Sequence, residues 1–168
     1  MKWIGISGSQ KVNKEMEQDV RKDVQNILAE GNGILVGGAL GVDSFALAET
    51  LSIDPEVRYI KVYLPATLER YAAHYRRRAE EGVISTEETE TLITLLSKAK
   101  NDHAVSFTEH PENTEMNQTT YYERNSAIVA AADELHAFQS NKSQGTQDTI
   151  DKAKTKGIPV IVYSYSIS

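Results

Sequence analysis

Small residues gather where two apolar runs of the sequence meet, an arrangement typical of an anion-binding loop. The apolar residues 34–36 are followed by Gly37, Gly38, Ala39 and Gly41, and a second apolar run comes next. Glycine permits positive φ and lets a ligand approach the backbone. A helix that begins behind such a loop offers free amides and a positive dipole end to a phosphate. The alternative is a tight strand-to-helix turn in which the glycines serve packing alone.

Two further turns of small polar residues follow apolar stretches in the same way. The first turn consists of Ser7, Gly8, Ser9 and Gln10. The second lies within residues 140–146 and includes Ser143, Gly145 and Thr146. We expect the three turns to lie along one rim of the fold, where their backbone amides would hold a phosphate-containing ligand.

Two charged residues add chemistry to these turns. Asp43, at the start of the helix after the glycine loop, either contacts a ribose hydroxyl, acts as a base, or simply favours the helix N-terminus. Arg124, near the start of a later helix, should reach the same rim, where its guanidinium would clamp a phosphate or carboxylate. The alternative for Arg124 is a surface arginine paired with Glu123 or a neighbouring acid.

Basic and aromatic residues alternate within the helical pattern of residues 67–81. They are Arg70, Tyr71, His74, Tyr75, Arg76, Arg77 and Arg78. Such interleaving is typical of segments that contact nucleic acid or a nucleotide. The alternative is a solvated helix face whose arginine stems cover apolar surface.

The elements that position these residues alternate between strand and helix. The pattern predicts strands at residues 2–6, 34–36, 58–64, 103–107, 133–138 and 158–163. It predicts helices at residues 14–30, 42–51, 67–81, 85–100, 117–132 and 145–156. This alternation favours an α/β fold, a three-layer αβα sandwich around a mostly parallel sheet of about six strands. Right-handed crossovers would place every strand-to-helix turn at the carboxyl edge of the sheet, where such folds bind ligands.

Composition narrows the class of protein. The 168 residues suit one domain, residues 1–168, and the net charge of −6 argues against a dedicated duplex-DNA binder. The absence of cysteine excludes disulfides and thiolate zinc sites. The N-terminus turns polar too soon for a signal peptide or a membrane span, so we expect a cytoplasmic protein without membrane contact.

Several common enzyme signatures are missing. The turn after the first strand does not supply G-x-G-x-x-G, no Walker A lysine follows the glycines, and there is no G-x-S-x-G elbow. The four histidines are scattered rather than spaced as ligands, so we expect no metal site. An ordinary NAD dehydrogenase, P-loop NTPase or serine hydrolase is therefore disfavoured, and no cofactor is required.

The motifs together resemble the SLOG superfamily of Rossmann-like nucleotide-binding domains. The stretches are GISGSQ, VGGALGVDSFALAETL, YYERNSAIVAAADELHAF and SQGTQDTIDKAKTKGIPVIVY. The sequence is most similar to the DNA-processing protein A (DprA/Smf) branch, and less so to the Lonely Guy phosphoribohydrolases and the molybdenum-cofactor-carrier-like proteins. The resemblance implies a pocket formed by Gly8, Ser9, Gly37, Gly38, Ala39, Gly41, Asp43, Arg124, Asn125, Gly145 and Thr146. Many relatives dimerise, so it also implies a homo-oligomer.

Each branch implies a different activity. In the DNA-processing branch this rim binds single-stranded DNA and helps load a recombinase, usually within a longer chain. The Lonely Guy enzymes cleave the base from a nucleoside monophosphate and carry P-G-G-x-G-T-x-x-E, whose last carboxylate position is Thr149 here. Asp148 is one position off and should face elsewhere on the helix. A glycosidic bond that breaks toward an oxocarbenium ion needs a placed carboxylate, so we rank binding above hydrolysis.

Three hypotheses follow from the sequence. The leading one is a non-catalytic or weakly catalytic protein that binds a nucleotide or nucleotide derivative at the glycine-rich rim. The second is binding of single-stranded DNA by the rim together with Arg76, Arg77 and Arg78. The third is an N-glycosidase acting on nucleoside monophosphates, with Asp43 and Asp148 as the candidate catalytic residues.

Overall fold

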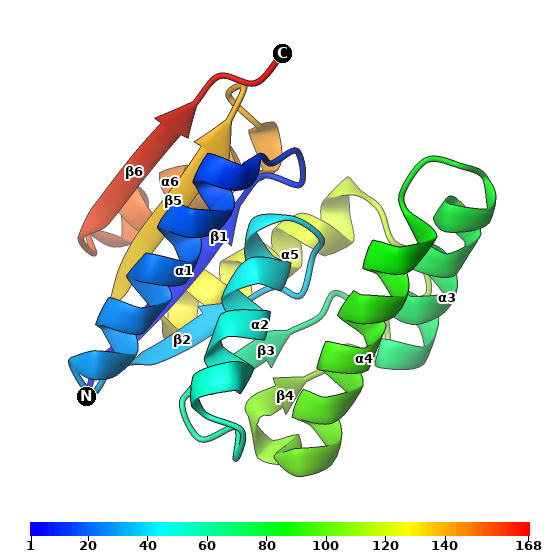
Figure 1. Ribbon diagram of the computed structural model, residues 1–168, viewed down its shortest axis with the longest axis horizontal. Helices are drawn as coiled ribbons and strands as arrows, with labels where there is room; N and C mark the ends of the chain where they lie inside the picture. Colours follow the sequence, from blue (N-terminus) through cyan, green and yellow to red (C-terminus); the bar gives the residue numbers. More distant parts are fainter.

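Six strands form one sheet in the computed structural model, which describes residues 1–168. The strands are β1 (Trp3–Gly8), β2 (Gly33–Val36), β3 (Ile60–Tyr63), β4 (Phe107–Thr108), β5 (Glu134–Ser140) and β6 (Val160–Tyr165). Every pairing is parallel, and the order across the sheet is β4-β3-β2-β1-β5-β6 (Figure 1). The chain thus builds outward from β1 to β4, and then returns past β1 to add β5 and β6 on the other side.

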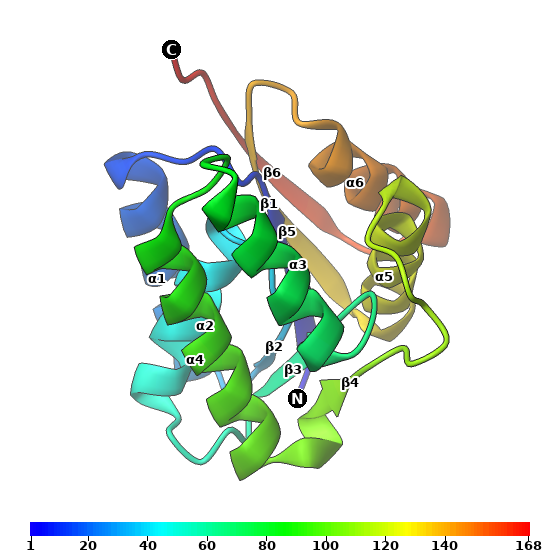
Figure 2. The ribbon, with the colours of Figure 1, turned by 90° about the vertical axis from the view of Figure 1, so that its right-hand side faces the viewer.

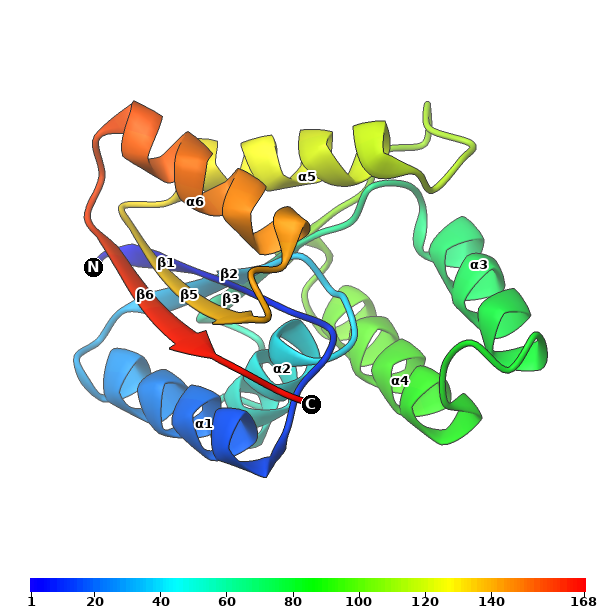
Figure 3. The same ribbon diagram turned by 90° about the horizontal axis from the view of Figure 1, so that it is seen from above.

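Helices cover both faces of the sheet. They are α1 (Lys14–Ala29), α2 (Val42–Ile53), α3 (Leu68–Glu80), α4 (Thr86–Asp102), α5 (Gln118–Ala131) and α6 (Gln144–Lys156). Figure 3 shows α5 and α6 above the sheet, with α1 and α2 below it. Helix α4 packs against α2, and α3 lies beside α4 (Figure 2), at the end of the molecule away from β6 (Figure 1). The Rossmann-like three-layer sandwich expected from the sequence is confirmed.

The larger core lies between the sheet and the layer of α1, α2 and α4. Its buried residues include Val24 of α1, Leu47 of α2 and Leu96 of α4, none of which is accessible to solvent. Smaller apolar clusters join α5 and α6 to the opposite face of the sheet, around Val129 and Ile150. Both faces of the sheet are therefore anchored, and this fixes the strand ends that carry the site.

Local signals set the helix ends. The Asn13 side chain accepts a hydrogen bond from the amide of Met16 at 2.9 Å and so caps α1, as predicted. Asn117 and Thr120 form a reciprocal capping box at the start of α5. Gly157 ends α6 with φ of 85°, a left-handed conformation that glycine adopts without strain. Side-chain caps therefore fix the starts of α1 and α5.

The predicted fourth strand was wrong in its position. Residues Ala104–Ser106 form a 3-10 turn, and the strand β4 comprises only Phe107–Thr108. The His103 ring lies 2.9 Å from the carbonyl oxygen of Val57 and 2.6 Å from the Ser106 hydroxyl, and these contacts accompany the turn. Val105 is 89% exposed, so the apolar character of this stretch did not mark a buried strand. None of the helices has the length and hydropathy needed to cross a membrane.

Candidate functional site

A cavity of about 400 Å³ opens where the strand order reverses, between β1 and β5. Open parallel sheets bind ligands at this switch point, because the loops after the two strands turn away from each other there. The walls come from the loops after β1, β2 and β5 and from the first turns of α5 and α6. The lining residues are Ile6, Ser7, Gly8, Gln10, Ala39, Asp43, Gln118, Tyr121, Tyr122, Arg124, Asn125, Ile128, Ser143, Gln144, Gly145 and Thr146.

Most of the residues chosen from the sequence line this cavity. They are Ser7, Gly8, Gln10, Ala39, Asp43, Arg124, Asn125, Ser143, Gly145 and Thr146. The remaining four, Ser9, Gly37, Gly38 and Gly41, are not part of its lining. The structure thus brings the three predicted turns together at one edge of the sheet.

The glycines of the first two turns make room for neighbouring protein atoms. A Cβ at Gly8 would lie 2.4 Å from Val42, and one at Gly41 would lie 2.4 Å from the carbonyl oxygen of Ser9. A Cβ at Gly37 would lie 2.6 Å from the guanidinium of Arg124. These positions match the packing interpretation of the glycine loop. Gly145 differs, since a Cβ there would have no atom within 4 Å and would stand in open space at the cavity.

Ser9 connects the loops after β1 and β5. Its side chain is 3% exposed, and its hydroxyl accepts a hydrogen bond from the amide of Ser140 at 2.9 Å. The amide of Val42 in turn donates to the carbonyl oxygen of Ser9 at 3.2 Å. Ser9 therefore joins the three turns behind the cavity wall and holds their spacing.

Arg124 lies inside the wall rather than on the surface. It is 7% exposed, its Nη1 donates a hydrogen bond to the carbonyl oxygen of Gly37, and its Nε donates to Asn125 at 3.2 Å. The alternative of a surface pair with Glu123 is wrong, because α5 turns Arg124 toward the sheet. The Glu123 carboxylate instead accepts a hydrogen bond from Asn113 at 3.3 Å.

Asp43 is the buried acid of the cavity, with 6% of its surface exposed. Its carboxylate accepts a hydrogen bond from the amide of Ala39 at 3.2 Å. Burial raises the pKa of Asp43 to about 6, although the charge of Arg124 and the amides of Ala39 and Gly37 oppose the rise. The cavity therefore contains a carboxyl group that changes charge just below neutral pH.

The N-terminus of α6 is open toward the cavity. Its N-cap residue Ser143 makes no capping hydrogen bond, and the first amides of a helix have no intrahelical acceptor. The loop before it carries Asn141 and Lys142 at φ of 49° and 54°, two successive left-handed residues that are not glycine. Backbone strain of this kind clusters at binding sites. The β5–α6 turn thus presents amides beside the uncrowded Gly145.

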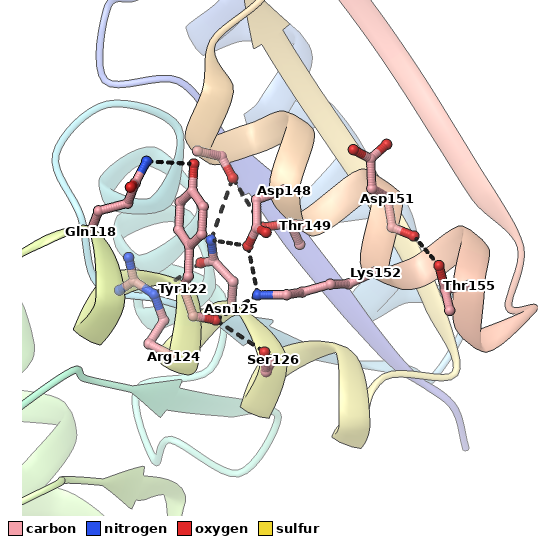
Figure 4. A network of polar contacts seen from close by, with 11 residues as sticks. Gln118, Tyr122, Arg124, Asn125, Ser126, Asp148, Thr149, Asp151, Lys152 and Thr155 are labelled. Atoms are coloured by element: carbon pink, nitrogen blue, oxygen red, sulfur yellow. Dashed lines mark hydrogen bonds and ion pairs between the residues drawn. The ribbon is translucent and has the colours of Figure 1, made fainter.

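The first turns of α5 contribute side chains that the sequence analysis did not select. Gln118, Tyr121 and Tyr122 line the cavity opposite α6. In Figure 4 the Gln118 amide reaches the Tyr122 hydroxyl, 3.3 Å away. The guanidinium of Arg124 lies 5.6 Å from the centre of the Tyr121 ring. The sequence did carry a signal for these side chains, because the first turns of a helix that starts at the predicted rim must lie at that rim.

Asp148 faces α5 and does not line the cavity. Its carboxylate accepts hydrogen bonds from Lys152 at 2.8 Å and from Asn125 at 3.2 Å (Figure 4). Asn125 also donates to the carbonyl oxygen of Gly145 at 3.4 Å. These contacts fasten the start of α6 to α5 and set the width of the cavity.

The aromatic residues of α3 do not form the exposed surface expected for them. Tyr71 and Tyr75 are buried, and the Tyr71 hydroxyl donates a hydrogen bond to the carbonyl oxygen of Gly38 at 2.9 Å. Arg76 forms an ion pair with Glu90 at 2.8 Å. None of the ion pairs in the structure involves Arg77 or Arg78. No group of three or more histidine and acidic side chains is arranged to hold a metal ion.

Comparison with known families identifies the family of this sequence. It matches the model of DNA recombination-mediator protein A over residues 1–168. The chain belongs to this family. The resemblance to the DNA-processing protein A branch is thereby confirmed. A search of curated proteins finds no match.

Two solved structures of DNA processing protein A have similar folds. DNA processing protein A from Helicobacter pylori gives a TM-score of 0.68 at 17% identity, over 96% of this chain and 64% of that one. That structure concerns the single-stranded DNA binding mode of the Helicobacter protein. The Streptococcus pneumoniae protein gives 0.62 at 14% identity, over 96% and 50%. The present chain thus spans about two thirds and one half of these relatives.

Proposed function

We propose that this protein binds single-stranded DNA, with one nucleotide of the strand seated in the cavity between β1 and β5. The observation that carries the proposal is the cavity itself, placed at the switch point of a chain whose whole length matches the recombination-mediator family. The similarity of the chain to a protein studied for single-stranded DNA binding supports the same proposal. Its volume of about 400 Å³ suits one nucleotide rather than a duplex.

The phosphate of that nucleotide would bind at the start of α6. The first turn of α6 lines the cavity, and Gly145 leaves space for a close approach of the ligand. Lys142, which is exposed, precedes this turn and adds a positive charge. A phosphodiester at this position would accept hydrogen bonds from the backbone, which do not depend on base sequence.

The base would contact the tyrosines of α5. Tyr121 and Tyr122 are both half-buried and both line the cavity. Bases stack on such rings with little preference for sequence. Lys152 lies 5.2 Å from the centre of the Tyr122 ring and so fixes that ring from the α6 side.

Neighbouring phosphates would reach α3. Arg78 follows Tyr71 and Tyr75 at helical spacing. Burial raises the pKa of Tyr121 to about 12, and the charges of Arg124 and Arg78 oppose this rise. Because the net charge is −6, we expect the DNA contact to be confined to a few cations such as Arg77 and Arg78.

The test is fluorescence anisotropy of a labelled oligo-dT with the full chain over a range of salt concentrations. Each phosphate contact on a single strand contributes about −0.7 to the slope of log K against log salt, so a slope of about −1 to −3 is expected. Arg78→Gln and Tyr122→Ala should weaken binding. Arg58→Gln is the matched control, because Arg58 pairs with Glu56 at 3.2 Å on the loop before β3, at the opposite edge of the sheet. Absence of binding, or equal losses in all three variants, would refute the proposal.

A free nucleotide is the second candidate ligand, favoured by the walled shape of the cavity. It would use the same α6 amides and the same tyrosines. Calorimetry against purine nucleotides, NAD and ADP-ribose tests it, and competition with oligo-dT shows whether the two ligands share the cavity. Asp148 is occupied by Lys152 and Asn125 and does not line the cavity, which argues against Asp148 as the carboxylate of a phosphoribohydrolase.

A further inference from the structure

Asp43 and Arg124 are held by the same short loop at one end of the cavity. The Asp43 carboxylate accepts a hydrogen bond from the amide of Ala39 at 3.2 Å, and Nη1 of Arg124 donates to the carbonyl oxygen of Gly37, two residues earlier. Both side chains line the cavity, and both are more than nine-tenths buried. The loop after β2 therefore places a carboxylate and a guanidinium beside each other in the cavity wall.

Each of these two side chains keeps one polar atom without a protein partner. Their hydrogen bonds use Oδ2 of the carboxylate and the Nη1 and Nε atoms of the guanidinium. The fully buried side-chain atoms that lack a hydrogen bond are Asp54 Oδ1 and Thr89 Oγ1, so Asp43 Oδ1 and Arg124 Nη2 remain accessible. An ionised carboxylate only accepts hydrogen bonds and a guanidinium only donates them. The cavity thus offers a ligand one acceptor and one donor, side by side.

This pair of side chains lies across the cavity from the start of α6. The pair sits on the loop after β2, whereas α6 follows β5, and β1 lies between these two strands. Two strand spacings separate β2 from β5, a distance of about 10 Å. A nucleotide whose phosphate binds at the start of α6 would therefore extend its base across the end of β1 toward Asp43. The reverse orientation would put the phosphate beside the carboxylate and is disfavoured by charge.

The aromatic wall lies next to the same pair. The guanidinium of Arg124 is 5.6 Å from the centre of the Tyr121 ring. A base that stacks on this ring would consequently bring its hydrogen-bonding edge to the guanidinium and the neighbouring carboxylate. Stacking alone tolerates every base, so any selectivity must come from that edge.

Guanine is the DNA base whose edge fits an acceptor beside a donor most fully. Its Watson–Crick edge presents the acceptor O6 followed by two donors, N1–H and the N2 amino group. Adenine and cytosine each present one amino donor, and thymine presents one donor between two carbonyl oxygens that a carboxylate would repel. Two parallel hydrogen bonds to a carboxylate are stronger and more specific than one.

We propose that the cavity selects guanine, with Asp43 accepting from N1–H and the N2 amino group and Arg124 Nη2 donating to O6. The inference rests on the proposed function, in which one nucleotide of a single strand occupies the cavity. It adds a base preference at that one position, whereas the backbone amides and the tyrosines bind any sequence. Asp43 and Arg124 are then the residues that determine specificity.

The first experiment measures anisotropy of the full chain with oligo-dT strands that carry one central substitution: guanine, hypoxanthine or adenine. Hypoxanthine keeps O6 and N1–H and lacks only the amino group, so its comparison with guanine isolates one contact with Asp43. The guanine strand should bind at least about fivefold more tightly than either of the other two. Equal affinities would overturn the base preference and leave strand binding intact. Absence of binding to every strand would refute the proposed function itself, and this inference with it.

The second experiment repeats the series with Asp43→Asn and adds a strand with xanthine, which carries a carbonyl oxygen in place of the amino group. The asparagine amide donates where the carboxylate accepted, so guanine and hypoxanthine should bind equally. The xanthine strand should bind the variant more tightly than it binds the wild type, a gain that a purely structural role of Asp43 does not produce.

Asp151→Asn is the matched control, because Asp151 is exposed on α6 and its replacement removes the same charge. This variant should keep the preference for guanine over hypoxanthine. A guanine preference that persists in Asp43→Asn, or that disappears in Asp151→Asn, would overturn the assignment. The wild-type series of the first experiment decides the base preference if Asp43→Asn does not fold.

Discussion

The buried guanidinium of Arg124 donates a hydrogen bond to the carbonyl oxygen of Gly37, and this bond fastens α5 to the loop after β2. The two residues are on elements that approach the carboxyl edge from opposite faces of the sheet. The same guanidinium opposes the rise in the pKa of Asp43 that burial causes. The arginine thus acts first as an internal brace of the cavity wall, and its cost of burial is offset by these partners.

Alanine substitutions at Gly37 and Gly145 should change the stability of the fold in opposite directions. Gly37→Ala would place its Cβ 2.6 Å from Arg124, so we expect a loss of about 1–3 kcal/mol in the free energy of unfolding. Gly145→Ala meets no atom within 4 Å and lies in a helix, so the fold should gain up to about 1 kcal/mol. Its methyl group would nevertheless obstruct the cavity and weaken oligo-dT binding. Urea unfolding and anisotropy measure the two effects, and a neutral Gly37→Ala would contradict the brace.

The sheet and its helices were predictable because their signals are local. Asn13 caps α1 and Gly157 ends α6, as their types and positions in the sequence indicated. The fourth strand was misplaced because its signal is weak, since β4 pairs over only two residues at the sheet edge. The stretch before it is instead held in a turn by the His103 contacts with Val57 and Ser106, which no local pattern could reveal.

Backbone topology determines which turns meet at the site, and this part was predictable from the sequence. Side-chain packing determines which side chains line the site, and this part was not. Parallel connectivity alone brings the turns at Ser7, Asp43 and Gly145 to one edge. The burial of Arg124 depends on how α5 rotates against the sheet, which the sequence of a helix with little amphipathic character does not specify. For the same reason the tyrosines of α5 were missed as part of the lining.

Tyr71 is predicted to serve stability rather than DNA binding. Its buried hydroxyl donates to the Gly38 carbonyl at 2.9 Å and also reaches the Tyr75 hydroxyl at 3.1 Å. Tyr71→Phe leaves a buried acceptor without its donor, so we expect a loss of about 1–3 kcal/mol in unfolding free energy. Oligo-dT affinity should change little in the folded variant. A large loss of affinity without a loss of stability would instead return Tyr71 to the ligand surface.

Asp43 should make ligand binding depend on pH. Its pKa of about 6 means that the carboxyl is ionised at neutral pH and protonated below that value. An ionised Asp43 repels a phosphodiester, so lowering the pH through 6 should raise oligo-dT affinity by roughly fivefold, the effect of about 1 kcal/mol. Asp43→Asn should lose this part of the dependence and keep the part due to net charge. Parallel pH profiles of the two proteins separate the contributions, and identical profiles would exclude Asp43 as their source.

His136 should make stability fall at alkaline pH. Burial alone lowers the pKa of His136, but contacts with Asp23 at 2.7 Å and Glu134 at 2.9 Å raise it above its ordinary value of 6.5. A pKa that is raised in the folded state gives a stabilisation that is complete below about 6.5 and is lost as pH rises through the folded value. Both ring nitrogens face carboxylates, and only the charged ring donates to both.

Urea unfolding from about pH 6 to 9 should therefore show declining stability in the wild type and a flatter profile in His136→Gln. His74→Gln is the control, since burial lowers the pKa of His74 and this histidine therefore contributes no stabilisation that is lost as the pH rises. If the His136→Gln profile declines as steeply as the wild type, the pair of carboxylate contacts does not hold the imidazolium in solution.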